Sequence, residues 1–216
     1  MIIAIIGGTG KEGKGLAYRW AKIGHQVIIG SREQEKAQRI ASELNETYPN
    51  IKPLHGKQNL TAAQNADVVV ITVPYSAHPA IVESIKSSVQ GKIVIDVTVP
   101  LVPPKVSQVH IPASGSAAQE AQEMLGENVK VVSAFQNVSY EKLLEEADTL
   151  SDVLVCGNDS QAKQIVIDLI SEAGMRGFDA GPIQNSIVSE GLTSVLININ
   201  KKFGVHSAGI RIIGID

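Results

Sequence analysis

A glycine-rich loop near the N-terminus constrains the fold of this chain more than any other feature. The loop, residues 7–13, directly follows the apolar run Ile2–Ile6, and its Gly8, Gly10 and Gly13 match the spacing G-x-G-x-x-G. In a strand–loop–helix unit the first glycine permits a tight turn and the second lets the backbone approach a pyrophosphate. The third lets helix and strand pack closely. We therefore expect a dinucleotide with its pyrophosphate at the N-terminus of the following helix.

The rest of the chain alternates short apolar runs with amphipathic stretches. We predict strands at residues 2–6, 26–30, 67–73, 92–96, 129–134, 153–157 and 175–179, and helices at 13–23, 34–47, 77–87, 116–125 and 160–173. Apolar strands that alternate with helices indicate a mostly parallel sheet covered on both faces. The predicted fold class is α/β, a Rossmann-type doubly wound sheet, which binds ligands at the carboxyl ends of its strands.

The end of the second strand indicates which dinucleotide binds. An NAD site carries an acidic residue there for the ribose hydroxyls, whereas this chain has Ser31 and Arg32, with Lys36 one helical turn later. A hydroxyl, a guanidinium and an ammonium suit the 2′-phosphate of NADP, and Arg32 could also stack on the adenine. Glu33 should begin the helix and turn away. NADP is favoured, although Arg32 and Lys36 could also be ordinary solvated charges.

The C-terminal segment has a different pattern. Residues 182–203 have a helical pattern with no intervening strand, and residues 204–216 form an apolar tail. We interpret residues 1–181 as an NADP-binding Rossmann domain and residues 182–216 as a small C-terminal helical element that could not fold alone.

Composition excludes several classes of function. The net charge of −3 argues against a general nucleic-acid binder, and the single cysteine, Cys156, excludes an internal disulfide and suits a reducing compartment. The longest apolar run, residues 68–74, is too short to span a bilayer, and a signal peptide would separate the glycine loop from its strand. We expect a cytoplasmic protein with no nucleic-acid or membrane partner.

Later strand ends supply weaker candidates for cofactor contacts. Val73 and Pro74 should pass the cofactor's ribose, and Val99 follows the next strand. His78 could contact the nicotinamide half, or it could face solvent or cap a neighbour at the start of a helix.

A further strand end, at residues 133–139, carries two amides. Gln136 and Asn137, beside Ala134, could orient a ring rich in carbonyl and N–H groups, or they could simply hold a loop. No nucleophile has a convincing base near it in sequence, and hydride transfer needs neither. We predict no metal, because the remaining histidines lack partners at metal-ligand spacing; they are His25, His55, His110 and His206.

Nearly end to end, the chain resembles the NADPH-dependent reductases of the deazaflavin coenzyme F420. The matching segments are residues 5–10, 13–15, 30–32, 36–37, 131–134, 155–157, 179–182, 190–193, 196–200 and 209–210. Several of them have no general Rossmann explanation, so the resemblance is specific. It implies hydride exchange between the nicotinamide C4 of NADP and the deazaflavin C5.

The resemblance also implies residue roles. The residues that would hold NADP are Thr9, Gly10, Lys11, Glu12, Ser31, Arg32 and Lys36. The glycine spacing adds Gly8 and Gly13 to the expected contacts, and the strand-end positions add Val73, Pro74, His78 and Val99. Coenzyme F420 would lie between the Rossmann cleft and the C-terminal element, beside Ala134, Gln136 and Asn137. Family members are typically homodimers in which the C-terminal helices contribute to the contact.

Two features limit what the resemblance implies about the acceptor. Some members have histidine at the position of Gln136, so the acceptor is less firmly predicted than NADP. Lys201, Lys202 or Arg211 could meet the acidic tail of the deazaflavin or be solvated charges. The alternatives are an NADPH-dependent reductase of a flavin or ferric complex, and a non-catalytic NADP-sensing protein.

Overall fold

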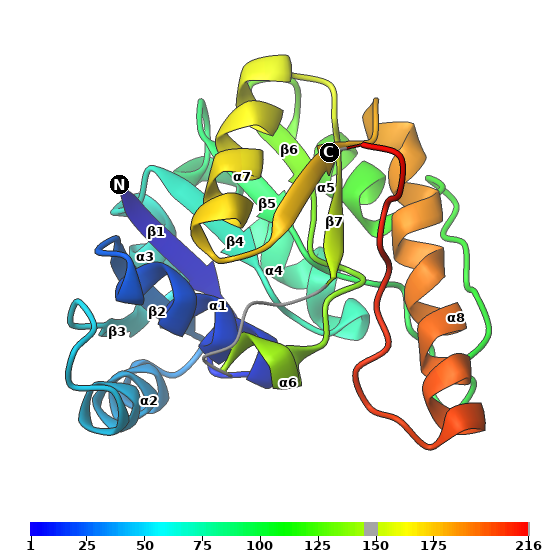
Figure 1. Cartoon of the computed structure of the whole chain (residues 1–216). Helices are drawn as coiled ribbons and strands as arrows, with labels where there is room; N and C mark the ends of the chain where they lie inside the picture. The colour runs from blue at the N-terminus through cyan, green and yellow to red at the C-terminus, as the bar shows by residue number, and fades with distance from the viewer. Residues whose placement is uncertain (145–150, 216) are drawn as a thin grey trace.

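Eight strands form one central sheet with helices on both of its faces (Figure 1). This computed structural model describes residues 1–144 and 151–215. The order is β3-β2-β1-β4-β5-β6-β7-β8, and each neighbouring pair is parallel except the antiparallel pair β6–β7. The strands are β1 (Ile2–Ile6), β2 (Gln26–Ser31), β3 (His55–Gln58), β4 (Val68–Ile71), β5 (Ile93–Asp96), β6 (Lys130–Ser133), β7 (Asp152–Gly157) and β8 (Arg176–Asp179).

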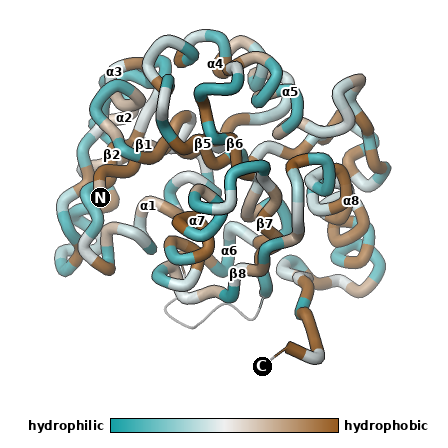
Figure 2. Tube along the Cα trace, turned by 90° about the horizontal axis from the view of Figure 1, so that it is seen from above, coloured by the Kyte–Doolittle hydropathy of each residue, from teal (hydrophilic) through white to brown (hydrophobic). Residues whose placement is uncertain are grey.

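The helices cover the two faces of the sheet in two groups. They are α1 (Lys11–Lys22), α2 (Gln34–Thr47), α3 (Asn59–Gln64), α4 (His78–Ile85), α5 (Ala117–Leu125), α6 (Tyr140–Leu143), α7 (Ser160–Glu172) and α8 (Ser186–Phe203). Ile3 and Ile5 of β1 pack with residues of α1, α2 and α7, whereas Ala4 and Ile6 pack with residues of α3, α4 and α5. Alternate side chains of a strand point to opposite faces, so a continuously apolar strand is buried on both. Figure 2 shows the hydrophobic central strands in the interior.

The fold class predicted from the sequence is confirmed, and most expected elements are present. The prediction missed β3, α3 and the short α6. Strand β3 has the polar sequence His-Gly-Lys-Gln and lies at the sheet edge, so it lacks the apolar signal of the central strands. Gly56 allows β3 to pack closely on α2, because a Cβ there would lie 2.2 Å from the carbonyl carbon of Ala37.

The C-terminal tail returns along the last strands of the sheet, beside α8 (Figure 1). The amide of Asp152 donates to the carbonyl of Ile210 at 2.9 Å, and the Asp152 carboxylate accepts from the amide of Ile212 at 2.5 Å. Arg176 of β8 forms an ion pair with the same carboxylate at 2.7 Å and donates to the carbonyl of Ile212 at 3.0 Å. The guanidinium and these hydrogen bonds hold the pKa of Asp152 below its ordinary value. The tail is thus attached to the sheet, and the domain division at residue 181 stays an interpretation.

Candidate functional site

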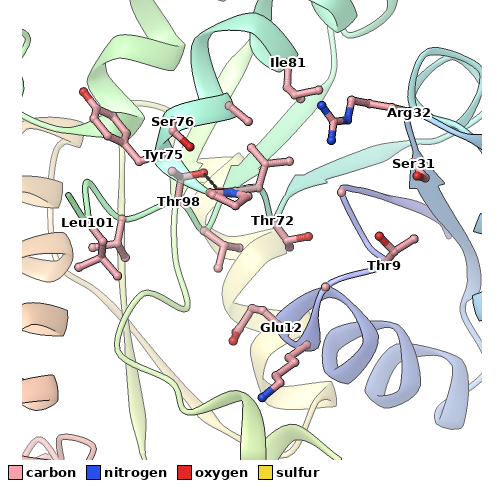
Figure 3. A pocket seen from close by; sticks show the side chains of 18 of the residues that line it. Thr9, Glu12, Ser31, Arg32, Thr72, Tyr75, Ser76, Ile81, Thr98 and Leu101 are labelled. Atoms are coloured by element: carbon pink, nitrogen blue, oxygen red, sulfur yellow. Dashed lines mark hydrogen bonds between the residues drawn. The ribbon is translucent and has the colours of Figure 1, made fainter. Parts of the chain in front are cut away.

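A cavity of about 600 Å³ opens at the carboxyl ends of β1, β2, β4 and β5 (Figure 3). This first cavity extends from the glycine loop and the end of β2 to the loop after β5. Its lining includes ten residues predicted from sequence: Thr9, Gly10, Lys11, Glu12, Ser31, Arg32, Lys36, Val73, Pro74 and Val99. Residues from four separate strand ends therefore meet around one space, as the doubly wound topology requires.

The tight turn after β1 depends on a different glycine from the one expected. Gly7 has φ +72°, a left-handed conformation that favours glycine, and a Cβ there would lie 2.4 Å from Val73. Gly8 has no such conformation; a Cβ on it would lie 2.7 Å from the carbonyl oxygen of Ile5. Assigning the turn to Gly8 was therefore wrong, and Gly8 instead permits close packing on β1.

Gly10 and Gly13 perform separate tasks. A Cβ on Gly13 would lie 2.6 Å from Cα of Gly8, so this position joins α1 tightly to the loop. A Cβ on Gly10 would have only the carbonyl oxygen of Gly7, 3.7 Å away, as a neighbour, and Gly10 lines the first cavity. Gly10 is also the N-cap of α1 and provides no capping side chain. The first amides of α1 therefore remain available to an anion at this end of the cavity.

The end of β2 presents two cations and one carboxylate to the cavity. Ser31 is buried, whereas Arg32, Glu33 and Lys36 are exposed, and all four line the cavity. Figure 3 shows the Arg32 guanidinium directed over the space next to Ser31 and Ile81. The expectation that Glu33 turns away was wrong: it is the N-cap of α2 and lines the cavity. The cations outnumber it, so the local charge still suits a phosphate.

A second cavity, of about 350 Å³, adjoins the first. The two share four lining residues, Glu12, Val97, Val99 and Leu101. The rest of its lining comes from the loop after β6, from α8 and from the tail: Phe135, Gln136, Asn137, Val138, Ser139, Tyr140, Thr193, Leu196, Ile197, Asn200, His206 and Ala208. The C-terminal segment thus contributes one wall of the combined site.

Gln136 and Asn137 are held firmly at the second cavity. The Gln136 amide nitrogen donates to the carbonyl of Asp96 at 2.7 Å and to Oγ of Ser133 at 2.9 Å. The Asn137 amide nitrogen donates to the carbonyl of Asp152 at 2.6 Å. The side-chain oxygens of both residues, Oε1 and Oδ1, are buried and have no hydrogen-bond partner among the described residues. The side-chain nitrogens therefore hold the loop, and the two side-chain oxygens are left without a partner among the described residues.

His78 and Ala134 lie away from both cavity linings. His78 is fully buried, with Nε2 2.7 Å from Oδ2 of Asp96, so the expectation of a cofactor-facing or solvent-facing histidine was wrong. Burial opposes the charge on His78, but the adjacent Asp96 carboxylate raises its pKa overall. Ala134 is also fully buried. Both residues come after the carboxyl end of a strand in sequence, yet their side chains point into the protein interior.

Glu12 has the most unusual environment of the acidic residues at the site. It lines both cavities, and its Oε1 is buried with no hydrogen-bond partner among the described residues. Burial raises the pKa of Glu12 to about 8. A second carboxyl, Glu190 of α8, has its pKa raised to about 8 by burial even though it accepts hydrogen bonds from the amides of Ala117 and Ala118. Glu190 thus accepts from the first amides of α5 and ties α8 to that helix.

Comparisons with known proteins show the family of this chain. Residues 2–100 match the family model described as NADP oxidoreductase, coenzyme F420-dependent. The F420-dependent NADP reductase of Methanocaldococcus jannaschii is 40% identical over 225 residues, covering 100% of both chains. The chain belongs to the F420-dependent NADP reductase family. The family's enzyme from Methanothermobacter thermautotrophicus is 39% identical over 220 residues, covering 98% of this chain and 94% of that one.

A solved structure supports the fold independently. A protein from Arthrobacter sp. FB24 superposes with a TM-score of 0.83 at 24% identity, covering 98% of both chains. Among the described residues, no helix is long and apolar enough to cross a membrane. Within the same residues, no three His, Cys, Asp or Glu side chains gather as a metal site.

Several lining residues were not predicted from the sequence. Tyr75, Ser76 and Ile81 line the first cavity from the segment after β4, and Asn59 lines it from α3. Asn59 Oδ1 accepts the amide of Gly7 at 3.3 Å, which ties α3 to the glycine loop. Thr193 reaches the second cavity from α8 and donates to the carbonyl of Gln136 at 2.7 Å. The sequence of α8 carries several other polar residues, so polarity alone could not have singled out Thr193.

Proposed function

We propose that this protein transfers a hydride between NADP(H) and coenzyme F420. The observation that carries the proposal is the pair of adjoining cavities that share Glu12, Val97, Val99 and Leu101. One cavity has the phosphate-binding features of a dinucleotide site, and the other offers a mostly apolar space with fixed amide oxygens. Hydride transfer requires two rings held in contact, and the shared wall is where both could meet.

The residues of the first cavity fit NADP. The exposed backbone of Gly10 and the first amides of α1 would hold the pyrophosphate, with Arg32 and Lys36 on the 2′-phosphate. Val73, Pro74 and Val99 would line the path of the ribose and nicotinamide. In this arrangement the negative groups of the cofactor would lie at the cationic end of the first cavity, and the nicotinamide ring would lie at the junction of the cavities.

The residues of the second cavity fit a flat ring with polar edges. Phe135, Leu196 and Ile197 give it apolar walls, and the unpaired oxygens of Gln136 and Asn137 could accept hydrogen bonds from ring N–H groups. When bound, the deazaflavin accepts or donates a hydride at a ring carbon. The role of the protein is then to orient two rings and exclude water, for which no nucleophile is needed.

The proposed function is tested by anaerobic mixing of the protein with NADPH and oxidised F420, following the deazaflavin absorbance. Parallel reactions replace NADPH by NADH as the hydride donor, or F420 by a free flavin as the acceptor. Rapid bleaching with NADPH and little with NADH is the expected result. Tight NADPH binding without bleaching would contradict the proposal and favour another acceptor or a sensing role. Gln136→Ala should slow F420 reduction while NADPH binding stays normal.

We also propose a homodimer that forms through α8. Val188, Leu192, Val195 and Ile199 follow the helical spacing of a single stripe, and Val188 and Val195 are 66% and 46% exposed. Figure 2 shows α8 at the periphery of the molecule, with hydrophobic stretches along it. A second copy of the chain that presents the same stripe would cover the exposed Val188 and Val195 side chains. Val195→Glu should give a monomer in sedimentation equilibrium, and a wild-type monomer would contradict the proposal. The cytoplasmic location likewise stays a prediction.

A further inference from the structure

Glu12 occupies the junction of the two cavities with a carboxyl oxygen left unpaired. It is the second residue of α1, one of the four residues that line both spaces. Its Oε1 is buried and has no hydrogen-bond partner in the described chain. A buried polar atom without a partner is rare in native proteins and calls for a ligand or a chemical role. The proposed hydride transfer would take place at this junction.

Burial, rather than the neighbouring charges, determines the protonation state of Glu12. The other titratable residues of the two linings are Lys11, Arg32, Glu33, Lys36, Tyr75, Tyr140 and His206. The Lys11 ammonium donates a hydrogen bond to the Tyr140 hydroxyl at 3.1 Å. The positive end of α1 favours the carboxylate of Glu12, but loss of solvation outweighs this, and burial raises its pKa to about 8. At neutral pH Glu12 is therefore mostly a neutral acid with a proton to give.

We propose that Glu12 is the proton donor that accompanies hydride transfer. This inference rests on the proposed function. Reduction of the deazaflavin by NADPH requires one hydride and one proton. The hydride passes from nicotinamide C4 to deazaflavin C5 with its electron pair, and the proton passes from the Glu12 carboxyl to the ring nitrogen N1.

The step balances in atoms and charge. NADPH becomes NADP⁺, the oxidised deazaflavin becomes its dihydro form, and Glu12 becomes a carboxylate that regains its proton from water. The new positive charge on the nicotinamide stabilises that carboxylate, since an opposite charge nearby lowers a carboxyl pKa. In the reverse direction the Glu12 carboxylate accepts the proton as the hydride returns.

The first test measures proton release without any deazaflavin. Calorimetric titration at pH 7 in phosphate and in Tris gives the protons released when NADP⁺ or NADPH binds. If the oxidised ring lowers the Glu12 pKa by about 2 units, NADP⁺ releases roughly 0.8 of a proton more than NADPH. Glu12→Gln should abolish this difference, and the exposed Glu46→Gln of α2 should preserve it. An undiminished difference in Glu12→Gln would overturn the proposal.

The second test follows the transfer itself in single turnovers. At pH 7 and saturating NADPH, Glu12→Gln should reduce F420 about 100-fold more slowly, the lower range for loss of a general acid. In the wild type the forward rate constant should fall as pH rises through about 8. The reverse rate constant starts from the NADP⁺ complex, in which the Glu12 pKa is lowered by about 2 units, so it should rise with pH over a range about 2 units lower. Glu12→Gln should lose both dependences, and Glu12→Asp, which retains a proton, should keep them at a reduced rate.

The outcomes separate the two proposals. If the wild type fails to reduce F420, the proposed function fails and the role of Glu12 fails with it. If the wild type reduces F420 and a folded Glu12→Gln does so at the same rate with the same pH profile, only the role of Glu12 is overturned. Thermal melting of each variant identifies a folded protein before either comparison.

Discussion

Arg32 provides the sharpest test of cofactor choice, because it is one of the two cations proposed to hold the 2′-phosphate that NAD lacks. Its guanidinium is exposed and lines the first cavity beside Ser31. A hydrogen bond to a charged group contributes about 1.5–3 kcal/mol, and exposure to solvent and salt favours the lower part of this range. We therefore expect Arg32→Ala to weaken NADPH binding by about 1.5–2 kcal/mol, which is roughly 10- to 30-fold in Kd.

The assay compares NADPH with NADH by calorimetry or fluorescence titration. NADH lacks the 2′-phosphate, so its affinity should change by less than about twofold if the guanidinium acts only there. Arg39→Ala is the matched control, since Arg39 is an exposed α2 residue paired with Glu43 at 3.7 Å and lies outside the cavity lining. Added salt should reduce the difference between wild type and Arg32→Ala.

Two results would refute the reasoning. An equal loss for NADPH and NADH would mean that Arg32 acts on the adenine or on local structure. No loss for either would make Arg32 an ordinary solvated charge.

The remaining predictions concern the glycine loop, the cavity mouth and a buried carboxyl. Gly10→Ala should leave the melting temperature unchanged but weaken NADPH binding at least about tenfold. Gly13→Ala should lower the melting temperature by about 2–12 °C, because a Cβ there overpacks the contact with Gly8. Equal melting temperatures for the two variants would contradict this division. Glu33→Gln should tighten NADPH by about 2- to 5-fold in titration, and weaker binding would count against a phosphate there. Because the folded pKa of Glu190 is raised to about 8, the native state holds an extra proton between pH 4.5 and 8. Stability should therefore fall as pH rises through this window, less steeply in Glu190→Gln, and melting curves with equal slopes would refute this.

Much of the NADP half of the site could be predicted because its signals are local. The strand Ile2–Ile6, the glycine spacing and the Ser31–Arg32 pair all lie within one strand–helix–strand unit. Local sequence there fixes the backbone, and the backbone supplies most of the phosphate contacts. Even so, the sequence did not show that the turn depends on Gly7. Its positive φ and its close approach to Val73 are visible only in the structure.

The second half of the site depends on contacts between distant parts of the chain. Thr193 and His206 reach the second cavity only because α8 and the tail return to the sheet. His78 is a strand-end candidate by position, but its ring turns inward to Asp96.

The sequence by itself determined the fold class, the family resemblance and the phosphate loop, because periodicity and glycine spacing are short-range properties. Only the tertiary structure decided which strand-end side chains face the cavities and which are buried. It also decided that Glu12 stands at their junction without a partner, because burial depends on every element packed around a residue.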